Sequence, residues 1–263
     1  LIIDDTDHPL IIKVASIQSA RMQVYFIDND DYFQNRLQTA DENGVEYGDN
    51  DSRAIFYARG VLETVKKLRW CPDIIHCHDW QTGLIPVYLH DSFQSDPFFW
   101  GIKTIFTIHN LKFQGTWSVD TIKGFSGLSD YYFTSDKLEA YGNGNMLKGG
   151  LVYADRITTV SRSYASEIRM PFYGEGLDGL LRARSKQLSG IVNGIDYNVY
   201  NPKTDKDIAV NYSVEDVIKA KAANKTALQK ELGLEENPDA FMLGIVSRLT
   251  DPVSYTHLTL PTK

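Results

Sequence analysis

The chain has 263 residues, and 27 Lys and Arg against 34 Asp and Glu give a formal charge of −7. This acidic balance argues against a general nucleic-acid binder, which needs a basic face to neutralise phosphates. No apolar run reaches the ~18 residues of a membrane helix. We therefore expect neither a nucleic acid nor a membrane among its partners.

The two cysteines, Cys71 and Cys77, are too few for a disulfide framework. Reduced, buried thiols are the ordinary state of such residues inside the cell. We therefore expect a cytoplasmic location.

The first part of the chain predicts two strands, a loop and a helix. Pro9–Ala15 and Met22–Ile27 are rich in β-branched and aromatic side chains, which favour strands. The polar stretch Asp28–Asp51 predicts a loop, with a short helix around Tyr32–Thr39. Apolar residues at steps of three and four then predict an amphipathic helix over residues 52–70.

Five apolar segments follow, and each predicts a buried strand. Helical segments such as Ser163–Arg169 and Asp216–Leu232 separate several of them. This alternation predicts an α/β fold with a parallel sheet that is covered on both faces. The five segments are Ile74–Cys77, Lys103–Ile108, Arg156–Val160, Leu188–Val192 and Phe241–Val246.

Polar side chains follow these strands. In an open parallel sheet, ligands bind at the carboxyl ends of the strands, so these residues are candidates for one site. They predict a polar pocket with an aromatic wall, suited to a hydroxyl-rich ligand and one anion. They are His76–Trp80, His109–Asn110, Ser161, Asn193–Asp196 and Ser247–Arg248.

A metal site and a structural role are the alternatives for the histidines. His76 and His78 lie two apart on a strand and face one way, so a zinc site is conceivable. Cys77 points to the opposite face and no HxxxH or CxxC spacing follows, so we expect no metal and interpret His76 as a core histidine with a bonded ring. His109 also allows a structural role, but Asn110 and a loop glycine follow it and favour function.

Seven segments in this order resemble bacterial glycogen synthases and plant starch synthases. The resemblance runs from about Tyr47 to Asp251, and the ordered set is more specific than any single motif. The segments are His76–Gly83, Thr104–Asn110, Asn145–Asp155, Ile157–Ser161, Gly174–Leu181, Gly190–Asp196 and Ile245–Thr250.

The resemblance implies a GT-B fold, which consists of two Rossmann-like domains, and a retaining glucosyltransferase. Such an enzyme moves glucose from ADP-glucose or UDP-glucose to the non-reducing end of an α-1,4-glucan, and it needs no metal or other cofactor. On this basis the partners are a nucleoside diphosphate glucose and the glucan. The choice between the two nucleotides stays open.

Two matches of the resemblance concern the transferred glucose and the donor. His109 is similar to the histidine that contacts the transferred glucose and stabilises charge near the transition state. Arg248 matches the arginine that grips the donor diphosphate, a role that suits its fork of donors and permanent charge.

The remaining matches concern sugar and acceptor binding. Asp79 and Trp80 match a His-Asp-Trp element on the acceptor side of the cleft. Asn110 and Asn193 match asparagines that bond sugar hydroxyls, and an amide offers both a donor and an acceptor for this. Tyr47 resembles a tyrosine that lines the same site.

The sequence departs from the family at both ends. The family's Lys-Thr-Gly-Gly loop is absent, a lysine expected five residues after Arg248 is Val253, and residues 252–263 match nothing in the family. We interpret residues 1–238 as an incomplete N-terminal domain, 239–251 as the first strand of the C-terminal domain, and 252–263 as a cloning or assembly junction. We therefore expect this fragment to be inactive by itself.

Two other functions remain open. One is another GT-B sugar-nucleotide enzyme, such as an epimerase, which would need no glucan acceptor. The other is a non-catalytic glucan-binding remnant, because aromatic residues could stack on sugars, namely Trp80, Trp117, Tyr131 and Tyr132.

Overall fold

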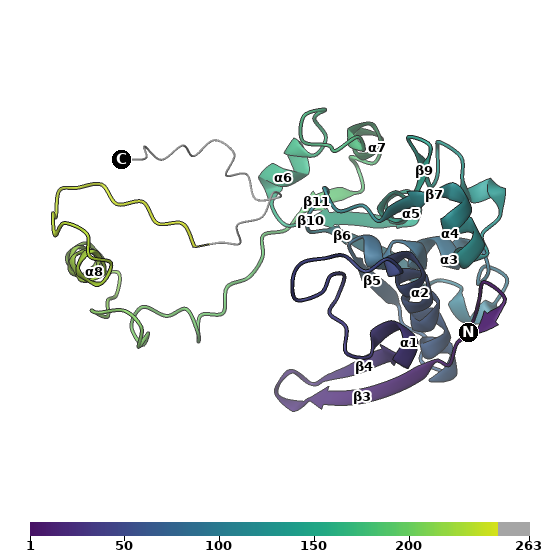
Figure 1. The fold of residues 1–263 in the computed structure, drawn as a ribbon, viewed down its shortest axis with the longest axis horizontal. Coiled ribbons are helices and arrows are strands. Elements are labelled where there is room, and N and C mark those ends of the chain that lie inside the picture. Colours follow the sequence, from purple (N-terminus) through teal and green to yellow (C-terminus); the bar gives the residue numbers. More distant parts are fainter. Residues whose placement is uncertain (247–263) are drawn as a thin grey trace. The chain divides into compact units, whose positions relative to one another are not determined.

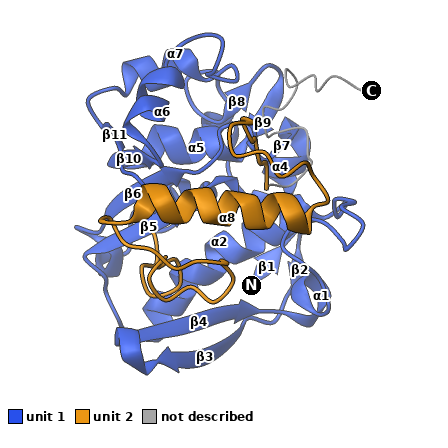
Figure 2. Cartoon of the chain, turned by 90° about the vertical axis from the view of Figure 1, so that its left-hand side faces the viewer, with its two compact units in different colours: residues 1–192 blue, residues 193–263 orange. Residues whose placement is uncertain are grey.

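The computed structural model describes residues 1–246. The chain divides into two compact units, residues 1–192 and residues 193–263 (Figure 2). No helix in the described part combines the length and apolar character that crossing a bilayer requires. The predicted Arg248 and the predicted junction at 252–263 lie outside the described residues.

Unit 1 is built on a four-stranded parallel sheet, which confirms the predicted α/β class (Figure 1). The strand order is β11-β10-β6-β5. The bounds are β5 Ile74–His78, β6 Lys103–Ile108, β10 Arg156–Thr159 and β11 Leu188–Gly190. All four strands were predicted from their apolar runs.

Three smaller sheets flank this one in unit 1. The largest is an antiparallel hairpin that was predicted as two strands, β3 Ile11–Ile17 and β4 Met22–Asp28 (Figure 1). The others pair β1 with β2 and arrange three strands in the order β7-β9-β8. Their bounds are β1 Ile2–Ile3, β2 Thr6–Asp7, β7 Thr116–Ser118, β8 Glu139–Ala140 and β9 Asn143–Asn145.

Seven α-helices of the described residues belong to unit 1. The core forms where α2, α3 and α5 pack together and against the sheet. The bounds are α1 Asp30–Phe33, α2 Asn50–Lys67, α3 Leu84–His90, α4 Val119–Ser126, α5 Met146–Tyr153, α6 Arg162–Glu167 and α7 Asp178–Ala183.

The predicted helix over Tyr32–Thr39 is wrong in position. Helix α1 begins at Asp30, because the Asn29 side chain accepts hydrogen bonds from the backbone N–H groups of Asp31 (2.9 Å) and Tyr32 (3.1 Å). It ends at Phe33, since Gln34 is extended. Residues 34–49 therefore form a loop.

The prediction that helices cover both faces of the sheet is wrong for β5. Its residues alternate between exposed and buried, and Ile74 is 53% exposed. The strands lie side by side in the sheet in the same order as in the sequence, from β5 to β11, without a reversal. Right-handed crossovers between such strands place the connecting helices on one face of the sheet. On the opposite face, His76 Nε2 lies 2.7 Å from Thr107 Oγ1, so His76 has a bonded ring but an exposed position rather than a core one.

The second unit contains α8, Val217–Glu231, close to the predicted helix. The fifth predicted strand, Phe241–Val246, is not formed, and Phe241 is 88% exposed. A strand requires a neighbour for its backbone hydrogen bonds. No ladder to these residues occurs in the described part of the chain.

Candidate active site

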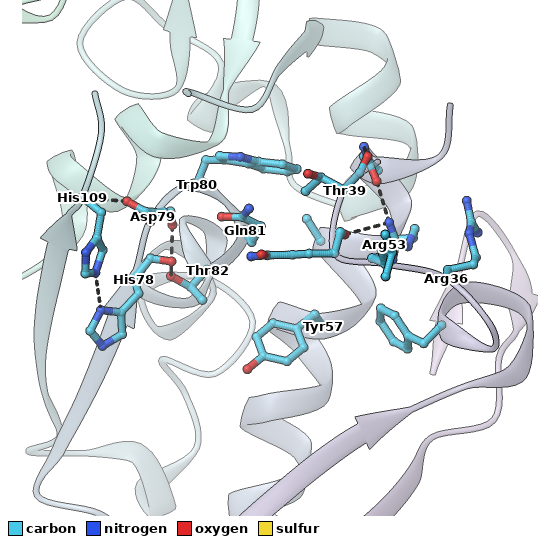
Figure 3. A pocket seen from close by; sticks show the side chains of 15 residues that line it. Arg36, Thr39, Arg53, Tyr57, His78, Asp79, Trp80, Gln81, Thr82 and His109 are labelled. Atoms are coloured by element: carbon cyan, nitrogen blue, oxygen red, sulfur yellow. Dashed lines mark hydrogen bonds between the residues drawn. The ribbon is translucent and has the colours of Figure 1, made fainter. Parts of the chain in front are cut away.

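A pocket of about 560 Å³ opens in unit 1 where β5 and β6 end (Figure 3). Its volume lies in the range of small-molecule sites. The lining comes from the loop before α2, the first turns of α2 and the ends of the two strands. The lining residues are Phe33, Arg36, Leu37, Gln38, Thr39, Asn50, Arg53, Ala54, Tyr57, His78, Asp79, Trp80, Gln81, Thr82 and His109.

Two imidazoles form one side of this pocket (Figure 3). His78 is the last residue of β5, and His109 directly follows β6. His78 Nδ1 lies 3.0 Å from His109 Nε2. Burial, and then the neighbouring His76 and His109, lower the pKa of His78, while Asp79 opposes this effect. The neutral form of His78 is therefore favoured.

Asp79 holds the two strand ends together. Its Oδ1 accepts a hydrogen bond from the backbone N–H of His109 (2.8 Å), and its own N–H donates to the carbonyl of Thr107 (3.0 Å). Its backbone has φ 58° and ψ −176°, a conformation that is otherwise almost confined to glycine. Such strain costs about 1–3 kcal/mol and persists where the surrounding contacts require it.

Trp80 forms the aromatic wall. It is 8% exposed, and its ring lies 5.4 Å from that of Trp117. Gly115 has φ +63°, and a Cβ at this position would lie within 3.1 Å of three Trp80 atoms. A residue without a side chain is thus needed at position 115 for the indole to occupy its place.

Arg53 builds the opposite side of the pocket. It is 5% exposed, and its Nε donates to the carbonyl of Tyr32 (2.8 Å). Its Nη1 donates to Gln38 O (3.0 Å) and Asn50 Oδ1 (2.6 Å), and its Nη2 donates to Leu37 O (3.0 Å). Burial lowers the pKa of Arg53. Through these four hydrogen bonds, Arg53 of α2 holds the preceding segment, including the loop of residues 34–49, against the helix.

Tyr47 does not line the pocket but lies beside two arginines that do. The guanidinium carbons of Arg36 and Arg53 lie 4.3 and 4.9 Å from its ring centroid. Its hydroxyl accepts a hydrogen bond from the N–H of Leu37 (3.0 Å). Arg36 also forms a two-pronged ion pair with Asp49. Tyr47 therefore supports the pocket loop from behind.

The structure brings three of the seven predicted site residues together: His109, Asp79 and Trp80. Asn110 follows His109, but its Oδ1 accepts from the N–H of Lys112 (3.0 Å) and it does not line the pocket. Asn193 is exposed at the start of the second unit.

The sequence analysis misses Arg36 and Arg53; it includes His78 among the strand-end candidates for the pocket but gives it no individual role other than a rejected metal site. The spacing of His76 and His78 on one strand face was an available signal for His78. Arg36 and Arg53 carry no comparable local pattern. In the described residues, no group of three or more His, Cys, Asp or Glu side chains is placed to hold a metal ion.

Comparison with known proteins gives consistent matches. The model of the starch synthase catalytic domain family matches residues 3–183. The glycogen synthase of Lachnospira eligens is 58% identical over 241 residues, 91% of this chain and 49% of that protein. The glycogen synthase of Thermotoga maritima is 46% identical over 244 residues, 93% of this chain and 49% of that protein.

A solved structure is also similar. It is the catalytic domain of starch synthase IV from Arabidopsis thaliana, bound to ADP and acarbose, with a TM-score of 0.72 and 30% identity. The match covers 89% of this chain and 46% of that one. The chain thus spans about half the length of the relatives that it matches.

Proposed function

Because the chain belongs to the starch synthase catalytic domain family, we propose that it supplies the acceptor side of a retaining glucosyltransferase. The reaction moves glucose from a nucleoside diphosphate glucose to the non-reducing end of an α-1,4-glucan. The family resemblance carried by the sequence motifs is confirmed, and so is the fold class.

The observation that carries this proposal is the pocket at the ends of β5 and β6. It lies within the segment that the family model matches, and it combines imidazole, carboxylate and amide groups with an indole wall. A sugar ring has hydroxyl groups at its edge and C–H groups on its faces. Polar groups that converge beside an aromatic ring suit both parts of such a ligand.

In this proposal, His109 holds the transferred glucose and stabilises charge at the reacting centre. Trp80 packs against a sugar face, and Asp79 contacts a sugar while one of its oxygens holds the His109 backbone. Asn110 and Asn193 remain proposed sugar contacts, and Arg248 remains a proposed contact of the donor diphosphate.

We propose ADP-glucose as the donor, on the support of a structural relative that is bound to ADP. UDP-glucose remains the alternative, and the assay below includes both. No metal or other cofactor is part of the proposed reaction.

A chimera tests the function. The segment of the Lachnospira eligens glycogen synthase that this chain matches would be replaced by the matched residues of this chain, and transfer of labelled glucose to glycogen measured. We expect transfer from ADP-glucose and retention of the α-configuration. His109→Ala should lower kcat about 10²–10³-fold, the usual cost of losing a group that stabilises developing charge.

The control is His90→Ala, which removes an exposed histidine outside the pocket and should leave transfer unchanged. A chimera that binds glycogen without transferring glucose would favour the glucan-binding alternative. Turnover of the sugar nucleotide without any glucan would favour another sugar-nucleotide enzyme. Equal losses of turnover and glucan binding in His109→Ala would make His109 a structural residue.

A further inference from the structure

His78 and His109 form a pair that joins neighbouring parallel strands. In the β5–β6 ladder His78 lies opposite Thr107, two residues before His109. The two rings are 5.3 Å apart and inclined by 33°. At 3.0 Å, Nδ1 of His78 and Nε2 of His109 must share one proton, because a hydrogen bond requires one donor and one acceptor.

The end of β5 therefore holds both the ring and the backbone of His109. His78 contacts the ring, and Asp79 accepts the backbone N–H at 2.8 Å. The carbonyl of His78 is itself held, since Thr82 Oγ1 donates to it at 2.9 Å (Figure 3). These three bonds restrict the position of His109 from one side of the pocket.

His76 completes the surroundings of His78. Its ring lies 4.2 Å from that of His78, at an angle of 31°. Its Nε2 lies 2.7 Å from Thr107 Oγ1, which in turn lies 2.6 Å from Thr158 Oγ1. The imidazole of His78 thus has those of His76 and His109 as neighbours, and its lowered pKa favours a neutral ring that donates from one nitrogen only.

We propose that His78 is a positioning residue that donates its Nδ1 proton to Nε2 of His109 and so keeps the proton of neutral His109 on Nδ1. This inference rests on the proposed function, because a donor is what the oxygen atoms of a sugar or a departing diphosphate require. The bond that one ring nitrogen of a histidine makes decides the protonation of the other. His78 would then act through His109 without touching the substrate.

The test is the ¹⁵N chemical shifts of the His109 ring in the labelled 263-residue chain at neutral pH. We expect one protonated nitrogen, Nδ1, and one unprotonated nitrogen, Nε2. His78→Asn places an amide at about the position of Nδ1 and should keep this single tautomer. His78→Gln places the amide one methylene farther out and should give averaged shifts. Both replacements are polar, so neither opens an apolar cavity.

His76→Gln is the matched control, because it removes a histidine from the same strand face and leaves the His78–His109 bond in place. Averaged His109 shifts in the unaltered chain would overturn the proposal. So would a single tautomer with the proton on Nε2, or a His78→Gln chain that keeps the original pattern.

Addition of maltoheptaose and ADP separates this inference from the proposed function. A fixed tautomer that responds to these ligands supports both. A fixed Nδ1–H tautomer with no response to maltoheptaose supports the positioning by His78 and contradicts the proposed glucan site in this pocket.

Discussion

Replacement of Gly115 by alanine should displace Trp80 and destabilise unit 1. The position has φ +63°, so a Cβ meets backbone strain of about 1–2 kcal/mol. That Cβ would also lie 2.7 Å from Trp80 Cδ2 and 3.1 Å from Trp80 Cβ. Because the Trp80 Cβ is itself approached, rotation of the side chain cannot fully relieve the contact. Overpacking of this kind costs about 1–3 kcal/mol more.

Gly127→Ala is the matched control. Gly127 has φ +70°, and nothing lies within 4 Å of its Cβ position. It therefore shares the strain but not the clash, and the smaller entropy of the unfolded alanine chain affects both variants alike. We expect a loss of about 1–2 kcal/mol for Gly127→Ala and about 2–5 kcal/mol for Gly115→Ala.

Urea unfolding monitored by tryptophan fluorescence measures the difference. All four tryptophans lie in unit 1, so the signal reports that unit. With a slope of about 2 kcal/mol/M, the midpoint should fall by about 1–2.5 M for Gly115→Ala and by about 0.5–1 M for the control. Equal shifts of the two midpoints would refute the argument that Trp80 requires a glycine at position 115.

Three further outcomes are expected. Gly150→Ala should lower the free energy of unfolding, measured in urea, by about 2 kcal/mol, because overpacking of about 3 kcal/mol exceeds a helix-propensity gain of about 1 kcal/mol. The added Cβ would lie 2.7 and 2.8 Å from two ring atoms of the buried Phe106. Unchanged stability would contradict this. Hydrogen bonding from Arg36 holds the pKa of Asp49 below its usual range, against the opposing effect of burial. The ionised Asp49 therefore stabilises the folded state above pH ~4, and this stabilisation is lost as the pH falls further. Asp49→Asn should flatten the fall in unfolding free energy between pH ~5 and ~3, and an unaltered slope would contradict this. In thiol labelling at pH ~8, exposed Cys71 should react quickly and Cys77 only on unfolding, because burial raises the pKa of Cys77 to about 12; two fast thiols would show that Cys77 is accessible.

The local sequence was sufficient to predict the strands of the main sheet and part of the site. Apolar runs followed by polar residues marked β5 and β6, and the parallel arrangement then placed Asp79 and His109 at one edge. Both features depend on residues that are neighbours along the chain. The domain boundaries and the functional roles of all seven predicted site residues stay predictions.

Other features depended on contacts between distant residues. Arg53 is part of the site because its four hydrogen bonds reach oxygens between 3 and 21 residues away. The bond between His78 and His109 joins residues 31 apart and follows from the strand register. No local periodicity encodes either arrangement.

The sequence by itself thus determined which segments are apolar enough to form strands and which residues follow them. The tertiary structure decided which of those segments pair and which sheet face is covered. Phe241–Val246 has the composition of a strand but finds no ladder partner in the described residues, and β5 has one exposed face because the strand order runs in one direction. The physical reason is that a strand acquires its hydrogen bonds and its buried face from other segments, so its composition permits the structure but only the neighbours complete it.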